Sequence, residues 1–393
     1  MTIVPSAHAA DTTDHKAVLR GILQAESFPN ELFTRGQRRS VSPKRLARQV
    51  GAVRKDLGEV LQITGGHGSY SAWTRSRRVP VRLSIQADGK ISRLRIRKSR
   101  KFPTDLEGAL KGLQKLPGWV SVLVQKNGAD VFEQNAGELL SVGSAFKLAV
   151  LVALSAKVKS GEADWSTGLE VRDEHRTLNS PVVQRMPAGS VMTVHTLAVL
   201  MMALDDHAAT DILMEFVGRD AVGIVMGSKP VPSTLEYAKL RSETELADGY
   251  GASDAAGRMD ILDSLEEIPV PPAQTALLPS DRKINWLISS RRFCEMMQFV
   301  KDLTVFPNDH GLAVPSVWKR AALSAGGAAG GLSWTIWLEG SDKAEYCVSL
   351  TWNRGDGVDE SALSDLLVPL IRSLSNPVDQ AAQTASTKQT ASQ

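Results

Sequence analysis

A serine and a lysine stand three residues apart at the start of an apolar segment. Ser144 is followed by Ala145, Phe146 and Lys147, and the segment continues to Leu154 with no further polar residue. This spacing puts two side chains on one face of a helix, about one turn apart, and the surrounding apolar residues indicate that the helix is buried on every side. A buried lysine is costly unless it is paired or its pKa is lowered. A desolvated lysine beside a serine hydroxyl is a base beside a nucleophile.

The spacing alone does not prove a catalytic pair. The same Ser-x-x-Lys spacing occurs at 280–283 and 316–319, but neither of these begins a long apolar helix, so the context favours Ser144. A structural alternative is a serine that caps the helix and a lysine whose ammonium group reaches towards solvent. The local stretch leaves both interpretations open.

The composition bounds the class of protein. A chain of 393 residues is comfortable for two domains, and its composition is that of a soluble globular protein. No apolar run reaches about 18 residues, so no transmembrane helix is expected. Cys294 and Cys347 are too few for a disulfide framework, although they can form one bridge.

The net charge of +3 hides an asymmetry between the two ends. Residues 1–104 hold 21 Lys and Arg against 7 Asp and Glu, a net of +14, and the remainder has a net of −11. This division supports two domains. A basic domain can bind anionic partners. However, the arginines at 93, 95 and 97 alternate with apolar residues, as on a solvated strand face, so we expect no nucleic-acid partner.

Both ends of the chain differ from a folded domain. Residues 1–13 form a leader in which Ala7-His8-Ala9 is typical of a signal-peptidase cleavage site, without the apolar segment that should precede it. The sequence favours an exported protein, periplasmic or extracellular, with a truncated signal peptide; a cytoplasmic protein with a short leader stays open. Residues 376–393 are rich in Gln, Ser, Thr and Ala and are expected to be a disordered tail.

Residues 14–104 are predicted to form a small basic α+β domain. Apolar periodicity predicts helices over 15–25 and 43–61. Alternation over 82–85 and 91–96, with Asp88-Gly89 between them, predicts a hairpin. Helices followed by an antiparallel sheet suggest a domain like those of the NTF2 and steroid-isomerase group, without an acid–base constellation.

Residues 105–375 are predicted to form a second α+β domain. A helix over 106–113 and a hairpin around Asn127-Gly128 precede Ser144, and mostly helical sequence follows from 158 to 305. Alternating strands over 332–339 and 346–352 and an amphipathic helix over 359–374 close the domain. A sheet assembled from both ends would leave a cleft beside an all-α lobe, with Ser144 at its floor.

This order of elements, together with Ser144-Ala145-Phe146-Lys147, resembles the class A β-lactamase-like fold. Further segments with counterparts in that family are Pro187-Ala188-Gly189, Thr193-Val194, 206–213, 233–236, 286–294, 311–313 and Gly326-Gly327. With its basic N-terminal domain, the chain resembles the two-domain β-lactamase-like proteins that include the mycobacterial lipoprotein LpqF and the serine hydrolase of the clavulanic acid cluster.

Two family motifs are altered. The family's Ser-Asp-Asn motif corresponds to Asp205-Asp206-His207, so Asp205 replaces a proton-shuttling serine and His207 replaces a substrate-binding asparagine. The Lys-Thr-Gly motif corresponds to 325–328. Ala325 therefore replaces the cation that attracts a substrate carboxylate, and Ala328 replaces a hydroxyl.

The resemblance implies a serine hydrolase that forms an acyl-enzyme on Ser144, with Lys147 and Asp205 as further catalytic residues. His207, Gly326, Gly327 and Ala328 would contact the substrate, and the backbone N–H groups of Ser144 and Ala328 would form the oxyanion hole. The substrate is expected to be a small ester or a β-lactam-like amide, and no cofactor or metal is implied.

Other roles for these residues stay open. Asp205 could pair with Lys147 and hold it charged, and His207 could supply another base, or the two could simply cap and solvate a helix end. Glu236 is the candidate for activating the deacylating water. The alternative function is a catalytically impaired protein with a binding or scaffolding role; the oligomeric state is not predicted.

Overall fold

The computed structural model describes residues 14–24, 30–40, 42–57, 59–66, 68–175, 180–271, 284–306, 318–328 and 330–375. The chain divides into two compact units, one from residues 1–112 with 361–393 and one from residues 113–360. The predicted domain limits at 104/105 and 375/376 stay predictions. The two compact units differ from the predicted domains, because residues 361–374 of the last helix group with the N-terminal residues rather than with the second domain.

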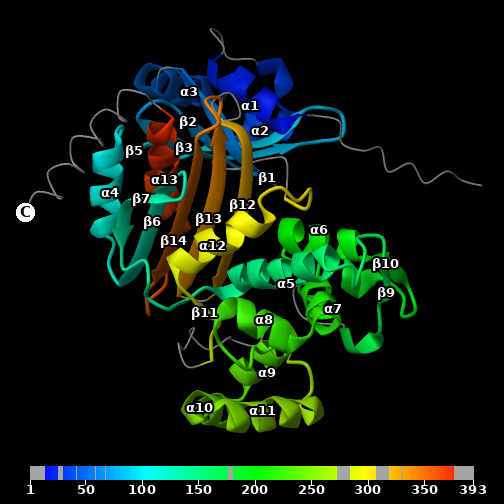
Figure 1. Cartoon of the computed structure of the whole chain (residues 1–393). Helices are drawn as coiled ribbons and strands as arrows, with labels where there is room; N and C mark the ends of the chain where they lie inside the picture. Colours follow the sequence, from blue (N-terminus) through cyan, green and yellow to red (C-terminus); the bar gives the residue numbers. More distant parts are fainter. Residues whose placement is uncertain are drawn as a thin grey trace, which may run out of the picture. The chain divides into compact units, whose positions relative to one another are not determined.

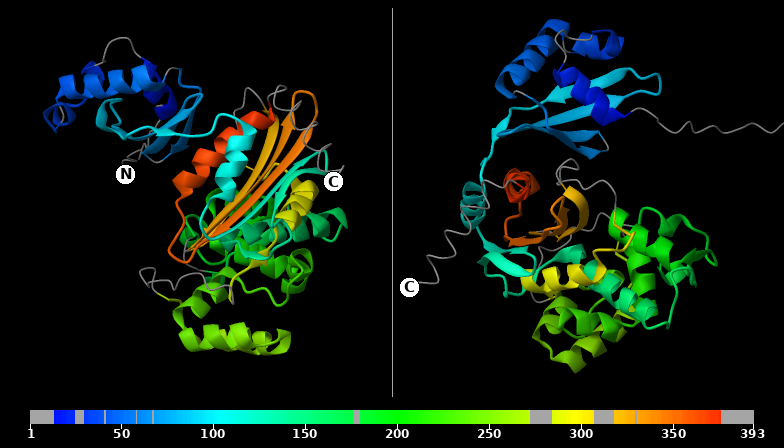
Figure 2. Two further views of the ribbon diagram at one scale, coloured as in Figure 1. Left: turned by 90° about the vertical axis from the view of Figure 1, so that its left-hand side faces the viewer. Right: turned by 45° about the horizontal axis from the view of Figure 1, so that its top comes forward.

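The first unit packs its N-terminal helices on one face of an antiparallel sheet (Figure 2). Its helical segments are α1 (His15–Gln24), η1 (Asn30–Leu32), α2 (Arg35–Ser40), α3 (Pro43–Leu57) and α13 (Glu360–Leu374). Its strands are β1 (Gln62–Gly66), β2 (Ser69–Trp73), β3 (Arg77–Ile85), β4 (Ile91–Ile96) and β5 (Arg100–Lys101). The sheet order is β1-β2-β3-β4, and β5 pairs with β3.

Alternation along β3 explains how this sheet is buried. Val79, Val81 and Leu83 are buried and belong to one core cluster with residues of α1 and α3, because alternate residues of a strand share a face. The predicted hairpin of β3 and β4 is confirmed, with Gly89 at a φ of +76° in its turn. The second predicted helix ends at Leu57 rather than at 61. The likeness to the NTF2 group stays a prediction.

The second unit contains a five-stranded antiparallel sheet (Figure 1). Its strands, in spatial order, are β12 (Trp318–Ala328), β13 (Gly331–Gly340), β14 (Glu345–Asn353), β6 (Trp119–Lys126) and β7 (Ala129–Gln134). The predicted sheet from both ends of the domain is therefore confirmed, as is the β6–β7 hairpin with Asn127 and Gly128 at positive φ. The glycine-containing strand β12 was not predicted, because glycine is a poor strand former.

A mainly helical lobe lies in the chain between β8 and β12, as the sequence predicted, although a short two-stranded sheet also lies within it. Its helices are α5 (Lys147–Lys159), α6 (Val194–Leu204), α7 (His207–Val217), α8 (Arg219–Met226), α9 (Thr234–Ser242), α10 (Thr244–Ala252), α11 (Ala255–Ser264) and α12 (Ser290–Val300). The shorter elements are β8 (Leu140–Ser141), η2 (Gly143–Phe146), β9 (Gly168–Glu170), η3 (Asp173–His175), η4 (Val183–Arg185), β10 (Val191–Thr193), η5 (Leu265–Glu267) and β11 (Leu287–Ile288). Helix α4 (Leu106–Gln114) precedes the sheet, as predicted.

Helix α5 forms the centre of the lobe. Its residues 147–155 are all buried, which confirms the helix expected to be buried on every side. Cys294 of α12 and Cys347 of β14 form a disulfide with Cα atoms 5.9 Å apart, so the two cysteines make the one bridge that their number permits. In the described part of the chain, no helix is long and apolar enough to cross a membrane.

Candidate active site

Ser144 lies in a 3₁₀ turn immediately before α5, and Lys147 is the first residue of that helix. Side chains three residues apart nearly eclipse one another in 3₁₀ geometry, so the predicted common face is kept although the turn is not α-helical. Gly143 has a φ of +51°, which a glycine adopts without steric cost. The side chain of Ser144 is half-buried, and among the described residues none accepts a hydrogen bond from its hydroxyl.

Several contacts fix the turn that holds Ser144. Strand β8 pairs with β11, and the phenyl ring of Phe146 stacks on the indole of Trp286 with ring centres 4.0 Å apart. The Asn353 side chain accepts a hydrogen bond from the Ser141 amide at 2.9 Å and donates one to the Ser141 carbonyl at 2.8 Å. Asn353 is a positioning residue that the sequence did not indicate, since 212 residues separate it from Ser141.

Strand β12 runs directly against this turn. A Cβ atom at Gly326 would lie 2.0 Å from the amide nitrogen of Ala145. Only a residue without a side chain permits that approach. The predicted binding residues Gly326, Gly327 and Ala328 therefore belong to a strand that contacts the backbone beside Ser144. The exposed Ala325 is two residues before Gly327, and no cationic side chain stands at that position.

Lys147, the second predicted catalytic residue, is hydrogen-bonded to Asp205, the third. Lys147 is 3 % exposed, and its Nζ atom donates a hydrogen bond to Oδ1 of Asp205 at 2.6 Å. Asp205 is the C-terminal cap of α6 and has a φ of +55°, in the left-handed region that non-glycine residues rarely adopt. This backbone turn brings the Asp205 carboxylate to the lysine. The pairing that the sequence left open is thus present.

Burial and charge act in opposite directions on this pair. Burial lowers the pKa of Lys147 from its ordinary value, and this effect exceeds that of the Asp205 charge and hydrogen bond, which raise it. Burial also favours protonation of Asp205, but the neighbouring His207 imidazole and the charge of Lys147 outweigh it, so the pKa of Asp205 lies well below its usual range. The result is a lysine that releases its proton more readily than a solvated one.

His207 is the next side chain along this network. Its Nε2 atom lies 3.8 Å from Oδ2 of Asp205, and its side chain is 20 % exposed. Asp205 does lie at a helix end, as the alternative interpretation proposed, but its side chain also pairs with Lys147. The side chain that caps α7 is that of Asp206, which accepts a hydrogen bond from the Ala209 amide at 3.0 Å. Asp206 is fully buried and also accepts hydrogen bonds from Ser180, Val182 and Val183.

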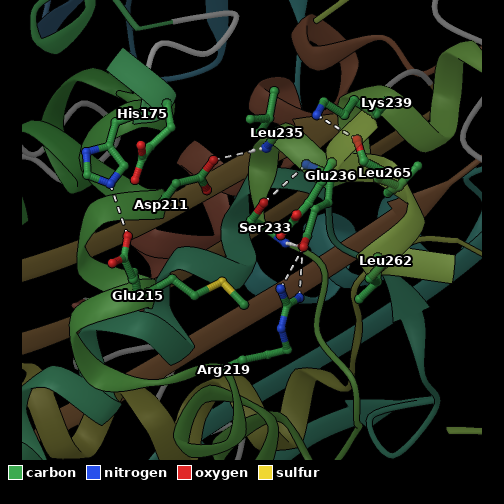
Figure 3. Close-up of a pocket in the computed structure, with 13 residues that line it drawn as sticks. His175, Asp211, Glu215, Arg219, Ser233, Leu235, Glu236, Lys239, Leu262 and Leu265 are labelled. Carbon is green, nitrogen blue, oxygen red and sulfur yellow. Dashed lines mark hydrogen bonds and ion pairs between the residues drawn. The ribbon is translucent and has the colours of Figure 1, made fainter. Parts of the chain in front are cut away.

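A separate cavity of about 460 Å³ lies within the α-lobe (Figure 3). The polar groups on its wall largely satisfy one another. Asp211 accepts hydrogen bonds from the amides of Thr234 and Leu235 at 2.7 and 3.0 Å, and Arg219 pairs with both carboxylate oxygens of Glu236 at 2.8 and 2.6 Å. These pairs brace the start of α9 and leave little unsatisfied chemistry for a ligand.

Glu236 therefore has a structural role. Its carboxylate accepts the Ser233 amide at 2.6 Å and completes a reciprocal cap at the start of α9. The expectation that it activates a deacylating water is a poor fit to these contacts. The repeated Ser-x-x-Lys spacing at 280–283 lies outside the described residues, as does Ser316. Among the residues that the structure describes, no group of three or more His, Cys, Asp or Glu could hold a metal ion.

Comparison with protein families gives a match over part of the chain. Residues 106–258 match the model of the beta-lactamase enzyme family. No curated protein matches the chain.

Similar solved structures are β-lactamases. The enzymes from Sphaerobacter thermophilus and Xanthomonas campestris pv. campestris are each 14 % identical, with 69 % of this chain and 96 % of theirs covered and a TM-score of 0.45. An ancestral class A β-lactamase is 16 % identical, covers 68 % of this chain and 98 % of its own, and has a TM-score of 0.45. The narrower likeness to the two-domain subgroup stays a prediction.

Proposed function

We propose that this chain, which is β-lactamase-like over residues 106–258, is a serine hydrolase that forms an acyl-enzyme on Ser144. The observation that supports this most directly is the buried Lys147, which follows Ser144 by one turn and is hydrogen-bonded to Asp205. A base with a lowered pKa beside a serine hydroxyl is the arrangement that activates a serine nucleophile.

The proposed acylation begins with neutral Lys147. The Ser144 hydroxyl transfers its proton to Nζ while Oγ attacks the acyl carbon of the substrate. The bond between the acyl carbon and the leaving group then breaks, the Nζ ammonium gives its proton to the departing alcohol oxygen or amine nitrogen, and the acyl group stays on Oγ. Water reverses the sequence by attacking the acyl carbon, so that Ser144 regains its proton and the acid is released. Backbone N–H groups near Ser144 and Ala328 would stabilise the oxyanion.

Asp205 has a different role from the serine that it replaces. Because the pKa of the Asp205 carboxyl group lies well below its usual range, the group is ionised at neutral pH and does not donate a proton to a leaving group. It orients Lys147 and favours the charged form of that lysine. Acylation therefore depends on loss of the Lys147 proton, and the rate should rise with pH.

We expect small uncharged esters to react better than carboxylated β-lactams. Ala325 supplies no cation for a substrate carboxylate, and the exposed Asp205 carboxylate repels an anion. An ester also needs less help with its leaving group than an amide. The test is hydrolysis of an uncharged activated ester and of a penicillin by the full chain, with Ser144→Ala as control. Ester turnover that Ser144→Ala retains would contradict the proposal.

The Lys147–Asp205 ion pair also favours a second candidate, a catalytically impaired protein with a binding role. A lysine that stays charged cannot accept the Ser144 proton. The two candidates differ in one outcome: the impaired protein forms no acyl-enzyme at any pH at which it stays folded. We further propose that the chain folds in an oxidising compartment outside the cytoplasm, which the Cys294–Cys347 disulfide supports.

A further inference from the structure

Four arginines form a row on the sheet of the first unit, on the side away from its core. Arg93 and Arg95 alternate along β4 with the buried Leu94, Arg97 directly follows the strand, and all three arginines are exposed. Arg82 of β3 is exposed as well and lies directly opposite Arg95 in the antiparallel register. We call Arg82, Arg93, Arg95 and Arg97 the arginine face.

Like charges opposite one another on neighbouring strands destabilise a sheet. Within the described residues, no carboxylate forms an ion pair with any of the four arginines. The same side of β3 shows the contrast: Arg78 is four residues before Arg82 and pairs with Asp365 of α13, with contacts of 2.5 and 3.1 Å. One end of this sheet face is thus neutralised by the protein itself, and the other is left cationic.

The shape and chemistry of the arginine face suit a surface that presents phosphate groups. Guanidinium groups bind phosphate oxygens in pairs. Exposed Ser69 and Ser84 lie opposite Arg82 and Arg93 in the register and add hydroxyl groups to the same face. Several arginines on one pleated surface can therefore contact several phosphates at once.

Two observations favour a phospholipid surface over a nucleic acid. The Cys294–Cys347 disulfide is typical of an oxidising compartment, where nucleic acid is not the usual partner. Single-stranded nucleic acids also bind to aromatic side chains on which the bases stack. The aromatic residue on this side of β2 is Trp73, which is 1 % exposed and packs beside Arg78 rather than among the four arginines.

We propose that the arginine face docks the protein on an anionic phospholipid surface. The contact is electrostatic and peripheral. Membrane binding does not depend on whether Ser144 is catalytic, so the two proposals are tested independently.

The test measures co-sedimentation of the full chain with phosphatidylcholine vesicles that contain or lack phosphatidylglycerol. The variant Arg82→Gln/Arg95→Gln removes the opposed pair. Its matched control, Arg38→Gln/Arg39→Gln on α2, removes the same charge from exposed residues of a helix. Each basic residue near an anionic membrane contributes about 1 kcal/mol, so the first variant should bind about tenfold or more weakly than the control.

The expected result is binding of wild type and control only to the anionic vesicles, with release at high salt because exposed charges are screened. A second variant, Arg93→Gln/Arg97→Gln, should weaken binding similarly, and circular dichroism checks that both variants are folded. Absence of binding to anionic vesicles, or equal binding by face variants and control, overturns the proposal. Tighter, arginine-dependent binding to a single-stranded oligonucleotide also overturns it, in favour of a nucleic acid.

Discussion

Nζ of Lys147 lies 2.6 Å from Oδ1 of Asp205, and the two side chains differ greatly in exposure, 3 % against 58 %. The lysine is therefore desolvated while its partner remains in contact with solvent. The carboxylate can be screened by water and salt, but the lysine cannot. This difference explains why burial dominates the pKa of Lys147 even though a counter-ion is present.

Replacing Asp205 with Asn should move the pH dependence of acylation to lower pH. In the wild type, the rate of reaction with an activated ester should rise with an apparent pKa below the ordinary lysine value of 10.5. Asp205→Asn removes a charge and a hydrogen bond that raise the pKa of Lys147, so the rising limb should shift down. The measurement is the acylation rate against pH by stopped-flow absorbance.

A suitable control for this shift is Asp254→Asn in the same unit. Asp254 caps α11 through its side chain, and asparagine caps equally well, so one carboxylate is lost without loss of the cap. In Asp254→Asn, the rising limb of the acylation rate against pH should lie at the same pH as in the wild type. An unchanged limb in Asp205→Asn would show that Lys147 is not the base.

The same substitution should destabilise the protein in a pH-dependent way. Because the pKa of Asp205 is lowered below its unfolded value of 3.8, its contribution to stability is present above that value and is lost as the pH falls through the folded pKa. We expect Asp205→Asn to lower the free energy of unfolding by about 2 kcal/mol at pH 7, between the values for exposed and buried pairs. Denaturant titrations should show that the difference in the free energy of unfolding between wild type and Asp205→Asn becomes smaller below pH 3.8. A difference that stays constant with pH would contradict the lowered pKa of Asp205.

Gly326→Ala should separate β12 from the turn that holds Ser144. The added methyl group would lie 2.0 Å from the Ala145 amide nitrogen, so backbone must move. Overpacking of this kind costs about 1–3 kcal/mol, and acylation should slow by more than stability explains. Gly137→Ala is the matched control, because no atom lies within 4 Å of its added Cβ. Thermal melts and acylation rates that are alike in both variants would rule out the close approach.

Loss of the disulfide should lower stability without changing the site. In the chain-entropy description, closing a loop of 53 residues stabilises a protein by about 4 kcal/mol, an upper value for Cys294→Ala/Cys347→Ala. The free energy of unfolding, measured with and without reductant, should fall in the wild type on reduction and stay constant in the double variant. Two free thiols in protein isolated from an oxidising compartment would contradict the bridge.

Asn353→Ala should loosen the segment that leads to Ser144. It removes both hydrogen bonds to the Ser141 backbone and leaves a buried amide and carbonyl without these partners, at about 1–3 kcal/mol for each group. Acylation should slow, while Asn135→Ala serves as a comparison that removes one side-chain bond to the Val120 carbonyl of the same sheet. Equal acylation rates in the two variants would contradict the positioning role of Asn353.

Local patterns in the sequence were sufficient for several elements. The uninterrupted apolar run after Lys147 predicted the buried helix α5, and Asn127-Gly128 predicted the turn of the β6–β7 hairpin, because both signals arise from neighbouring residues. Strand β12 was missed for the opposite reason. Its glycines disfavour a strand locally, but pairing with β13 and contact with Ala145 require them.

The partners within the site could not be predicted in the same way. Nothing in the sequence states that the chain reverses at Asp205 through a left-handed residue, so its pairing with Lys147, 58 residues away, was only one of several alternatives. Asp206 and Asn353 were likewise not recognised as anchors, since their hydrogen-bond partners come from other segments. Motif resemblance singled out Ser144, Lys147 and Asp205 as candidates, whereas the contacts that these residues make depend on tertiary geometry.

Intact-mass spectrometry after exposure to acylating probes tests the central claim most directly. The full chain is incubated with a fluorophosphonate, an activated ester and a penicillin, and the adduct is mapped to a residue. We predict a single adduct on Ser144 with the fluorophosphonate and the ester, faster at higher pH, and none on Ser144→Ala. Folded wild-type protein that forms no adduct with any probe, or an adduct that persists in Ser144→Ala, would contradict a serine hydrolase centred on Ser144 and Lys147.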